Sequence, residues 1–207
     1  MSNHQHVDRR IKRTSRFLRD AFIELLKEKD VNSITVQEIA DRADLTRATF
    51  YLHYKNKQHF ISQSMEDMLN ELIERVKPDL SESDTMYPPP SFLSLFEFIQ
   101  EHADYFEVML SDRGLPQFRS SLLKIVQKRI YGELLSSIAE SEERLTVPKD
   151  ILISYITSAH IGVISTWLKS GMKFSPVYMA EQLTRLTMLG PIKVAGLENK
   201  IKIPFVK

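Results

Sequence analysis

The chain has 207 residues, 43% of them hydrophobic, which suffices for one or two domains with a buried core and argues against disorder. It has no cysteine, so disulfides and thiolate metal sites are excluded and a reducing compartment is favoured. The amino-terminal residues are polar and charged, and no stretch approaches the roughly 18 apolar residues of a membrane span. We therefore expect a soluble, cytoplasmic protein without a membrane segment.

The net charge of +1 hides an uneven distribution. Residues 1–60 hold 12 Lys and Arg against 8 Asp and Glu, whereas residues 61–207 hold 16 against 19. The basic residues are densest between Arg9 and Arg19. Such a run attracts phosphates through counterion release, although an ordinary solvated helix face has a similar composition.

Helical spacing of apolar residues predicts the first element. Leu18, Phe22 and Leu25 recur on one side of a helix over residues 10–28. Asp30 provides turn chemistry directly after it. The sequence therefore predicts that the first helix ends before residue 30.

Capping residues predict two short helices after this turn. Thr35 and Glu38 have the spacing of a capping box, in which each side chain accepts a backbone N–H from the other residue. Residues 43–45 form a tight turn, and Thr46 caps the next helix. Asn56 caps a fourth helix that begins close behind.

Helical patterns continue to the end of the chain, and no strand or repeat pattern is found. Residues 78–90 are rich in proline and serine and predict a loop. Residues 193–207 predict a tail or a short extended segment. We therefore expect an all-α fold, with one domain of residues 1–60 and a second domain of residues 61–207. The remaining predicted helices span residues 57–76, 92–110, 115–140, 148–170 and 176–189.

Residues 34–57 have the pattern of a helix-turn-helix unit. The second helix of such a unit lies in the DNA major groove, and its N-terminal half meets base edges. Arg47 has a planar fork that matches O6 and N7 of guanine, and the methyl groups of Ala48 and Thr49 suit contact with a thymine methyl. Double-stranded DNA is therefore the expected partner.

Neighbouring polar side chains suit contacts with phosphates or bases. Ordinary alternatives exist for each, such as a solvated Arg47, a half-buried Tyr51 or a His53 that packs against the first helix. The predicted DNA-binding residues are Thr35, Thr46, Arg47, Ala48, Thr49, Tyr51, His53 and Lys57.

The segment from Thr35 to Lys57 resembles the TetR family of bacterial transcription regulators, most specifically in Phe50-Tyr51-x-His53-Tyr54-x-x-Lys57. The resemblance covers residues 10–60 and is weak beyond them. It implies an all-α homodimer that binds a palindromic operator, usually as a repressor that a ligand in the C-terminal domain releases. The residue pattern at positions 27–30 and 49–54 also resembles a Firmicutes-type subgroup of this family.

Two positions depart from the family pattern. The family commonly has Gly where this chain has Asp30 and Asp44. Both positions are expected to end helices in left-handed backbone geometry, which Asp tolerates better than most residues. The fold is therefore not in doubt, although Asp44 brings a negative charge close to DNA.

The resemblance also implies a dimer formed by the last two helices. Residues 151–168 are apolar on nearly all sides, so this helix needs its own core and a second partner. The second partner is another subunit, or else the helix is a buried core helix of a monomer. The predicted dimer-interface residues are Ile156, Ile161, Ile164, Trp167, Leu183 and Leu186.

A ligand pocket is predicted where aromatic and methionine side chains cluster, within residues 96–109 and 155–178. Such residues also form plain core, and the two histidines among them also serve ordinary structural roles. The predicted pocket residues are His102, Tyr105, Phe106, Met109, Tyr155 and His160.

No metal-ligand pair at helical spacing, Gly-rich phosphate loop or Ser nucleophile elbow occurs in the sequence. The sequence therefore predicts no enzyme, no metal site and no cofactor. We expect a transcriptional regulator whose partners are double-stranded DNA, a second copy of the chain and a small-molecule effector. Two alternatives stay open: an activator controlled by a protein partner, and an all-α binding or scaffold protein that does not use DNA.

Overall fold

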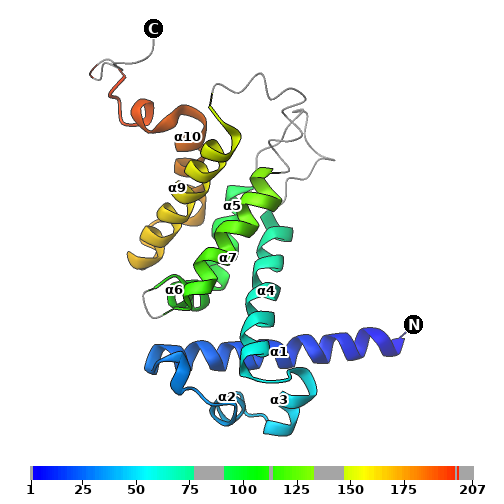
Figure 1. Ribbon diagram of the computed structural model, residues 1–207. Coiled ribbons are helices and arrows are strands. Elements are labelled where there is room, and N and C mark those ends of the chain that lie inside the picture. Colours follow the sequence, from blue (N-terminus) through cyan, green and yellow to red (C-terminus); the bar gives the residue numbers. More distant parts are fainter. Residues whose placement is uncertain (1, 77–90, 112–113, 133–146, 199, 201–207) are drawn as a thin grey trace. The chain divides into compact units, whose positions relative to one another are not determined.

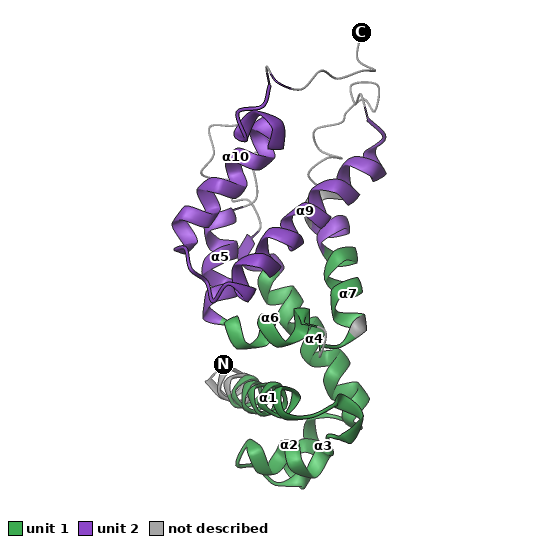
Figure 2. Cartoon of the chain, turned by 90° about the vertical axis from the view of Figure 1, so that its left-hand side faces the viewer, with its two compact units in different colours: residues 1–72, 102–125 green, residues 73–101, 126–207 purple. Residues whose placement is uncertain are grey.

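A computed structural model describes residues 2–76, 91–111, 114–132, 147–198 and 200. All regular secondary structure within these ranges is helical, which confirms the predicted fold class (Figure 1). The chain divides into two compact units (Figure 2). Unit 1 comprises residues 1–72 and 102–125, and unit 2 comprises residues 73–101 and 126–207. The predicted domain boundary at residue 60 falls inside one continuous helix and stays a prediction.

Unit 1 contains the predicted helix-turn-helix and the helices that support it. The third and fourth helices begin at the predicted residues, and the first begins at Ser2, earlier than its apolar pattern indicated. The elements are α1 (Ser2–Glu28), the short 3-10 turn η1 (Val31–Ser33), α2 (Val36–Arg42), α3 (Arg47–His53), α4 (Lys57–Val76, of which the last residues belong to unit 2), α6 (Ala103–Leu110) and α7 (Pro116–Val126).

An aromatic cluster joins α1, α3 and α4 at the centre of unit 1. The ring of Phe60 on α4 lies 5.5 Å from Phe22 on α1, 5.5 Å from Phe50 on α3 and 5.0 Å from Tyr54 at the end of α3, measured between ring centroids. Phe22, Phe50 and Phe60 are buried to 3% exposure or less. Edge-on and tilted rings at these distances add attraction to the large apolar area that they bury. The cluster therefore fixes which side of α3 faces inward.

The two Asp positions in the turns have different backbone conformations. Asp44 has a φ of 54°, in the left-handed region that the sequence predicted. The same prediction for Asp30 is wrong, because Asp30 is extended, with φ −64° and ψ 144°. Its carboxylate instead accepts the N–H of Asn32 at 2.8 Å and caps η1. The side chain, rather than an unusual backbone angle, makes this turn.

Unit 2 is built from long helices around a buried tryptophan. Trp167 is 2% exposed, its ring lies edge-on to Phe96 at 5.1 Å, and its indole N–H donates to the carbonyl oxygen of Phe174 at 2.9 Å. Helix α10 packs along α5 and also contacts α9. The elements are α5 (Phe92–Glu101), the π-helical turn η2 (Gln127–Gly132), α9 (Lys149–Lys169) and α10 (Pro176–Val194).

Several predicted boundaries change in the C-terminal half. The single helix predicted over residues 92–110 is wrong, because His102 (φ −119°, ψ 31°) separates α5 from α6. Helix α10 extends beyond residue 189 through a kink at Gly190, whose φ is 76°, and Pro191 follows this kink. The predicted loop at 78–90, the end of the predicted helix at 133–140 and residues 201–207 of the predicted tail lie outside the described residues.

His160 joins three helices in the core of unit 2. Its side chain is buried, its Nε2 lies 2.9 Å from the hydroxyl of Thr187 on α10, and its ring lies edge-on to Phe92 of α5 at 5.2 Å. Desolvation by burial lowers the pKa of His160 from 6.5 to about 4. The folded chain therefore holds this histidine neutral at pH values where the unfolded chain binds a proton.

We expect the stability of the protein to depend on this histidine at mildly acidic pH. Because the folded pKa lies below the unfolded one, the contribution of His160 is fully present above about pH 6.5 and is lost as the pH falls towards 4. The His160→Gln variant, which keeps a polar partner for Thr187, should lose less stability than the parent between pH 7 and pH 4. Urea unfolding at several pH values measures the difference. The half-exposed His53→Gln variant is the control, and parallel curves for parent and His160→Gln would contradict the assignment.

Candidate nucleic-acid interface

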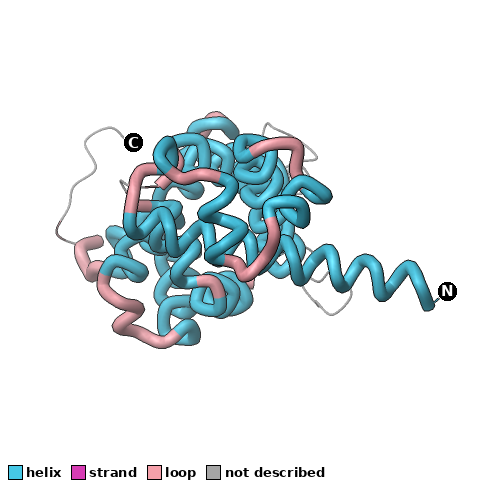
Figure 3. The backbone as a smooth tube through the Cα atoms, turned by 90° about the horizontal axis from the view of Figure 1, so that it is seen from below, coloured by secondary structure: helices cyan, strands magenta, loops and turns pink. Residues whose placement is uncertain are grey.

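Helix α3 buries one side and exposes the other. Phe50 is completely buried, whereas Tyr51 is 45% and Leu52 is 83% exposed. Ala48 and Arg47 are exposed on the same outward half of the helix. Figure 3, which views the chain from the side of α2 and α3, gives the backbone of this region. One side of this helix is fixed to the core, and the other side exposes both small and long side chains. Such a helix suits insertion into the major groove of DNA.

The two helices of the unit are capped as the sequence predicted. The hydroxyl of Thr35 accepts the N–H of Glu38 at 3.2 Å, and the carboxylate of Glu38 accepts the N–H of Thr35 at 2.9 Å. The hydroxyl of Thr46 accepts the N–H of Thr49 at 3.1 Å and lies 2.9 Å from the Thr49 hydroxyl. Both threonine hydroxyls therefore have partners within the chain and fix where each helix begins.

The side chains of Arg47 and Tyr51 contact each other on the outward side of α3. The guanidinium of Arg47 is 5.4 Å from the centre of the Tyr51 ring, and one of its nitrogens donates to the Tyr51 hydroxyl at 3.3 Å. Stacking on a ring restricts the flexible Arg side chain while leaving other N–H groups available. The pair therefore offers a cation and a hydroxyl together at the start of the candidate recognition helix.

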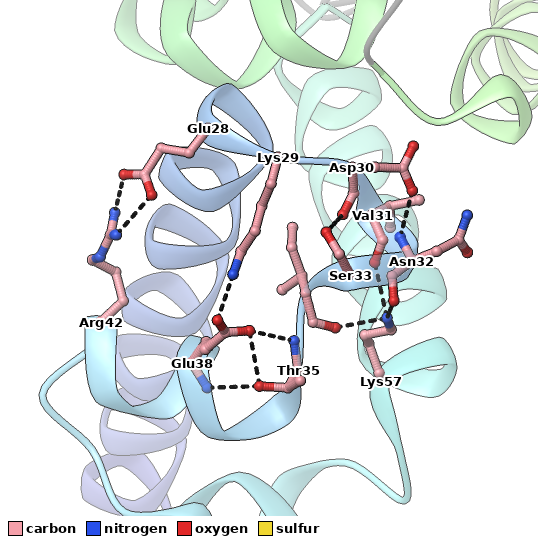
Figure 4. Close-up of polar contacts among 11 residues, drawn as sticks. Glu28, Lys29, Asp30, Val31, Asn32, Ser33, Thr35, Glu38, Arg42 and Lys57 are labelled. Atoms are coloured by element: carbon pink, nitrogen blue, oxygen red, sulfur yellow. Dashed lines mark hydrogen bonds and ion pairs between the residues drawn. The ribbon is translucent and has the colours of Figure 1, made fainter.

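Lys57 has a different environment from the predicted one. Its ammonium donates to the carbonyl oxygens of Val31 at 2.8 Å, Asn32 at 3.4 Å and Ile34 at 2.7 Å (Figure 4). These carbonyls belong to η1 and to Ile34, which follows it, and the Val31 carbonyl also accepts the N–H of Ile34 at 3.4 Å. Three contacts with the chain itself use all three N–H groups of the ammonium. This arrangement favours a structural role for Lys57 at the junction of η1 and α4 over the predicted phosphate contact.

Ion pairs join α2 to the C-terminal end of α1 and to the residue that follows α1, beside this junction (Figure 4). Arg42 forms a two-pronged pair with Glu28, at 2.9 and 3.1 Å. Lys29 donates to Glu38, and this contact, together with the two hydrogen bonds from Thr35, lowers the pKa of Glu38 to about 2. Single exposed ion pairs contribute little to stability. Their geometry nevertheless restricts how α2 can rotate against α1.

Leu52 is a residue of this surface that the sequence analysis missed. It is the most exposed of the large apolar side chains that the structure describes in unit 1. It lies four residues after Ala48, so the two share one side of α3. The spacing of Leu52 from Ala48 already indicates a shared side of the helix, but the predicted contacts were limited to polar and small residues. His53, by contrast, is half-buried, with its ring 6.1 Å from that of Tyr54.

The predicted ligand-pocket residues are not gathered at one described hollow. Tyr105, Phe106 and Met109 are buried in unit 1, whereas Tyr155 is 57% exposed on α9 of unit 2. Burial raises the pKa of Tyr105. Two hollows in the described residues, one between α4 and α7 and one between α5 and α10, are lined by other side chains. The predicted pocket, including half-buried His102 and buried His160, stays a prediction.

Most predicted dimer-interface residues are buried within unit 2, and their place in an interface stays a prediction. Ile161, Ile164, Trp167 and Leu183 are between 1% and 7% exposed within unit 2. Ile156 and Leu186 are half-buried. Apolar character alone did not reveal which side of each helix faces outward. The outward apolar residues of α9 and α10 are Ile151, Tyr155, Val177, Tyr178, Met188, Leu189 and Ile192.

We expect Lys57→Met to separate a structural role from a phosphate contact. Loss of the ammonium removes one donor from each of three carbonyls, so the unfolding free energy should fall by about 1–3 kcal/mol. A lost phosphate contact would instead flatten the plot of log affinity against log salt by about 0.9. Urea unfolding and salt-dependent DNA binding measure the two effects. Lys55→Met, which removes an exposed charge two residues away, is the control; a flatter salt slope with unchanged stability would contradict the structural role.

Comparison with known proteins supports the interpretation of this surface. The family description "Bacterial regulatory proteins, tetR family" matches residues 18–72, and "Transcriptional regulator C-terminal region" matches residues 87–189. A relative from Bacillus subtilis, the uncharacterized HTH-type transcriptional regulator YxbF, is 27% identical over 82% of this chain. The match spans 43% of the length of that relative.

Solved structures share the fold. The transcriptional regulator FadR from Bacillus subtilis, solved in complex with stearoyl-CoA, has a TM-score of 0.64 and 20% identity, with 84% of this chain and 98% of that chain covered. The dihydroxyacetone kinase operon activator DhaS has a TM-score of 0.57 and 19% identity, with 87% and 97% covered. The two family matches, which together span most of the described helices, and the helix-turn-helix geometry identify this chain as a member of the TetR family of bacterial transcription regulators.

Proposed function

We propose that this protein is a sequence-specific transcriptional repressor that binds a palindromic operator as a homodimer and is released by a small-molecule effector. The observation that carries the DNA-binding part is the anchored α3 helix, with Phe50 buried and Ala48, Tyr51 and Leu52 exposed on its outward side. Binding to chromosomal DNA implies a cytoplasmic location, in agreement with the absence of cysteine.

Each outward residue of α3 has a role that its chemistry suits. Arg47 donates to O6 and N7 of a guanine after it leaves the Tyr51 ring, and Tyr51 then donates its hydroxyl to a phosphate. Ala48 and Leu52 present methyl groups to a thymine methyl or to the sugar edge. Thr35, Thr46, Thr49 and His53 stand at the rim and position the helix. Lys57 acts through the backbone of η1 instead.

The homodimer is supported by exposed apolar side chains on α9 and α10 of unit 2. Ile151 and Tyr155 on α9 and Val177, Met188 and Ile192 on α10 are each at least 40% exposed. Contiguous apolar surface on a water-exposed helix marks a contact with another protein. A two-fold symmetric dimer presents two recognition helices to two half-sites and thereby explains a palindromic operator.

Helix α9 is also long and apolar enough to cross a membrane, contrary to the sequence-based expectation that no stretch approaches this length. A core helix of a soluble protein satisfies the same criterion. The inward side of α9 buries a tryptophan and a histidine against neighbouring helices of unit 2, as a helix of a packed bundle does. We therefore assign its outward side to a second copy of the chain.

The effector would act on the spacing of the two recognition helices. A ligand that binds the spread form of the dimer better than the DNA-bound form, by about 1–3 kcal/mol, would shift the population away from DNA. Activation is the second candidate, because DhaS, which shares the fold, is described as an operon activator. A reporter under the selected operator separates the two: deletion of the gene raises expression for a repressor and lowers it for an activator.

Selection of random duplexes by the purified protein tests the DNA-binding proposal. We expect an enriched palindrome with half-sites about one helical turn apart. Arg47→Ala should weaken binding to that palindrome by about 1–3 kcal/mol and relax one base position in each half-site. The exposed Lys128→Ala variant, on the π-helical turn η2, is the control. A folded, dimeric protein that enriches no motif at low salt would exclude this function and leave the scaffold alternative.

The dimer surface makes a separate prediction. Tyr155→Glu places a charge in the apolar interface, twice by symmetry, so the dimer dissociation constant should rise at least about tenfold because a buried, unpaired charge costs several kcal/mol. Leu52→Glu, an equivalent change at an exposed apolar position on α3, should leave dimerisation unchanged. Sedimentation velocity over a range of concentrations measures both. Equal dissociation constants for the parent and Tyr155→Glu would exclude this surface.

A further inference from the structure

A groove of about 500 Å³ lies between α5 and α10 in unit 2. Helix α10 packs along α5, and Figure 2 shows the two helices as neighbours. Phe92 and Ala180 line the groove at 6% and 8% exposure and form its floor. Leu93 and Val177 line it at 40% and 55% exposure and form its edge. The size and the apolar lining suit a small molecule, because ligand sites typically have volumes of roughly 300–1,000 Å³.

The floor of the groove is fixed by the core of unit 2. The ring of Phe92 lies edge-on to that of His160 at 5.2 Å, and Nε2 of His160 lies 2.9 Å from the hydroxyl of Thr187. The hydroxyl of Thr184, which also lines the groove, donates to the carbonyl oxygen of Ala180 at 2.8 Å. A floor that is held by such contacts needs little rearrangement when a ligand binds, which lowers the cost of binding.

Two opposite charges line the same groove, one helical turn apart on α10. Glu181 and Arg185 have the spacing of four residues, and the order along the chain, that ordinarily favour an ion pair on a helix surface. Among the residues that the structure describes, however, neither side chain has an ion-pair or hydrogen-bond partner. The carboxylate, which only accepts hydrogen bonds, and the guanidinium, which only donates them, are therefore both available to a ligand.

This combination selects a molecule that carries both charges. A ligand ammonium suits the carboxylate of Glu181, a ligand carboxylate suits the fork of Arg185, and an apolar side group suits the floor at Phe92. A ligand with a single charge leaves one of the two groove charges without a partner, so it is disfavoured. A free apolar α-amino acid has an ammonium, a carboxylate and an apolar side chain on one carbon atom and matches this lining.

Helix α10 also carries part of the proposed dimer surface. Met188 and Ile192 are 58% and 40% exposed and follow Arg185 by three and seven residues, so the three share one side of the helix. A ligand that holds α10 against α5 in one position would favour one arrangement of the two subunits over another. Operator affinity changes if these arrangements differ in the spacing of the recognition helices.

We propose that the groove between α5 and α10 binds a free apolar α-amino acid and that this class of molecule is the effector of the protein. The effector role rests on the proposed function, because it requires a dimer that binds operator DNA. The pocket residues predicted from the sequence do not line this groove.

Three ligands with one phenyl group test the charge requirement. L-Phenylalanine carries both charges, phenethylamine carries only the ammonium, and 3-phenylpropanoate carries only the carboxylate. Phenylalanine should bind at least about threefold more tightly than either analogue, because an exposed ion pair contributes a factor of about two to five. NMR titration of the purified protein measures these weak affinities without DNA. Failure of phenylalanine to bind, or equal affinities for the three ligands, would overturn the proposal.

Single variants assign each groove charge to its group on the ligand. Arg185→Gln should bind phenylalanine and phenethylamine almost equally, and Glu181→Gln should bind phenylalanine and 3-phenylpropanoate almost equally. Lys169→Gln and Glu198→Gln remove exposed charges of unit 2 outside the groove and should behave as the parent. Thermal unfolding confirms that all four variants are folded. A preference for phenylalanine that survives unchanged in both groove variants would place the ligand elsewhere and overturn the proposal.

A second copy of the chain is the rival occupant of the groove. Sedimentation velocity compares the dimer dissociation constants of the parent and Arg185→Gln, which should be equal. A dissociation constant that rises at least about tenfold, the change expected when a buried charge contact is lost, would assign the groove to a contact between subunits and overturn the proposal.

The outcomes also separate this proposal from the proposed function. If the parent binds phenylalanine but none of the selected duplexes, operator binding fails and the amino-acid site stands. If the parent binds both, saturating phenylalanine should change the affinity for the selected palindrome by about fivefold or more, and the palindrome should change the affinity for phenylalanine by the same factor. An unchanged operator affinity would overturn the effector role and leave operator binding by α3 intact.

Discussion

Burial of Phe50 is the constraint on which the candidate DNA-binding surface depends. Its ring packs at 5.5 Å from Phe60 and from Tyr54, and Phe60 in turn meets Phe22, so one cluster joins α1, α3 and α4. A seven-residue helix has little stability of its own and takes its orientation from such contacts. Once Phe50 faces inward, helical geometry alone directs Ala48 and Leu52 outward. The surface that meets a partner is thus a consequence of the core.

Polar contacts, in addition to the aromatic cluster, fix the position of the helix-turn-helix. The capping box of Thr35 and Glu38 starts α2, the Arg42–Glu28 pair ties the end of α2 to α1, and Lys57 ties η1 to the start of α4. Each of these contacts is weak or partly solvated when taken alone. Together they restrict how the helix-turn-helix can rotate, slide or separate relative to α1 and α4. Lys57 therefore links the start of α4 directly to the backbone of η1.

The two candidate partner surfaces of the chain have contrasting chemistry. The exposed side of α1 is basic and suits phosphates, whereas the exposed sides of α9 and α10 are apolar and suit another protein surface. The near-zero net charge of the chain conceals this separation. Two chemically distinct surfaces suit two different kinds of partner.

The sequence by itself determined the features that depend on neighbours within about four residues. The caps at Thr35, Thr46 and Asn56 follow from local spacing and agree with the structure, and the left-handed turn at Asp44, which the family resemblance implied, is also present. Only the tertiary structure decided the contacts between distant residues. Lys57 meets carbonyls 23 to 26 residues earlier, Trp167 and Ile164 are buried in the core of unit 2, and the predicted helix over 92–110 breaks at His102. Helical periodicity indicates that a side chain packs against apolar neighbours, but it does not identify the helix that provides these neighbours. Several sides of a long apolar helix satisfy the same pattern.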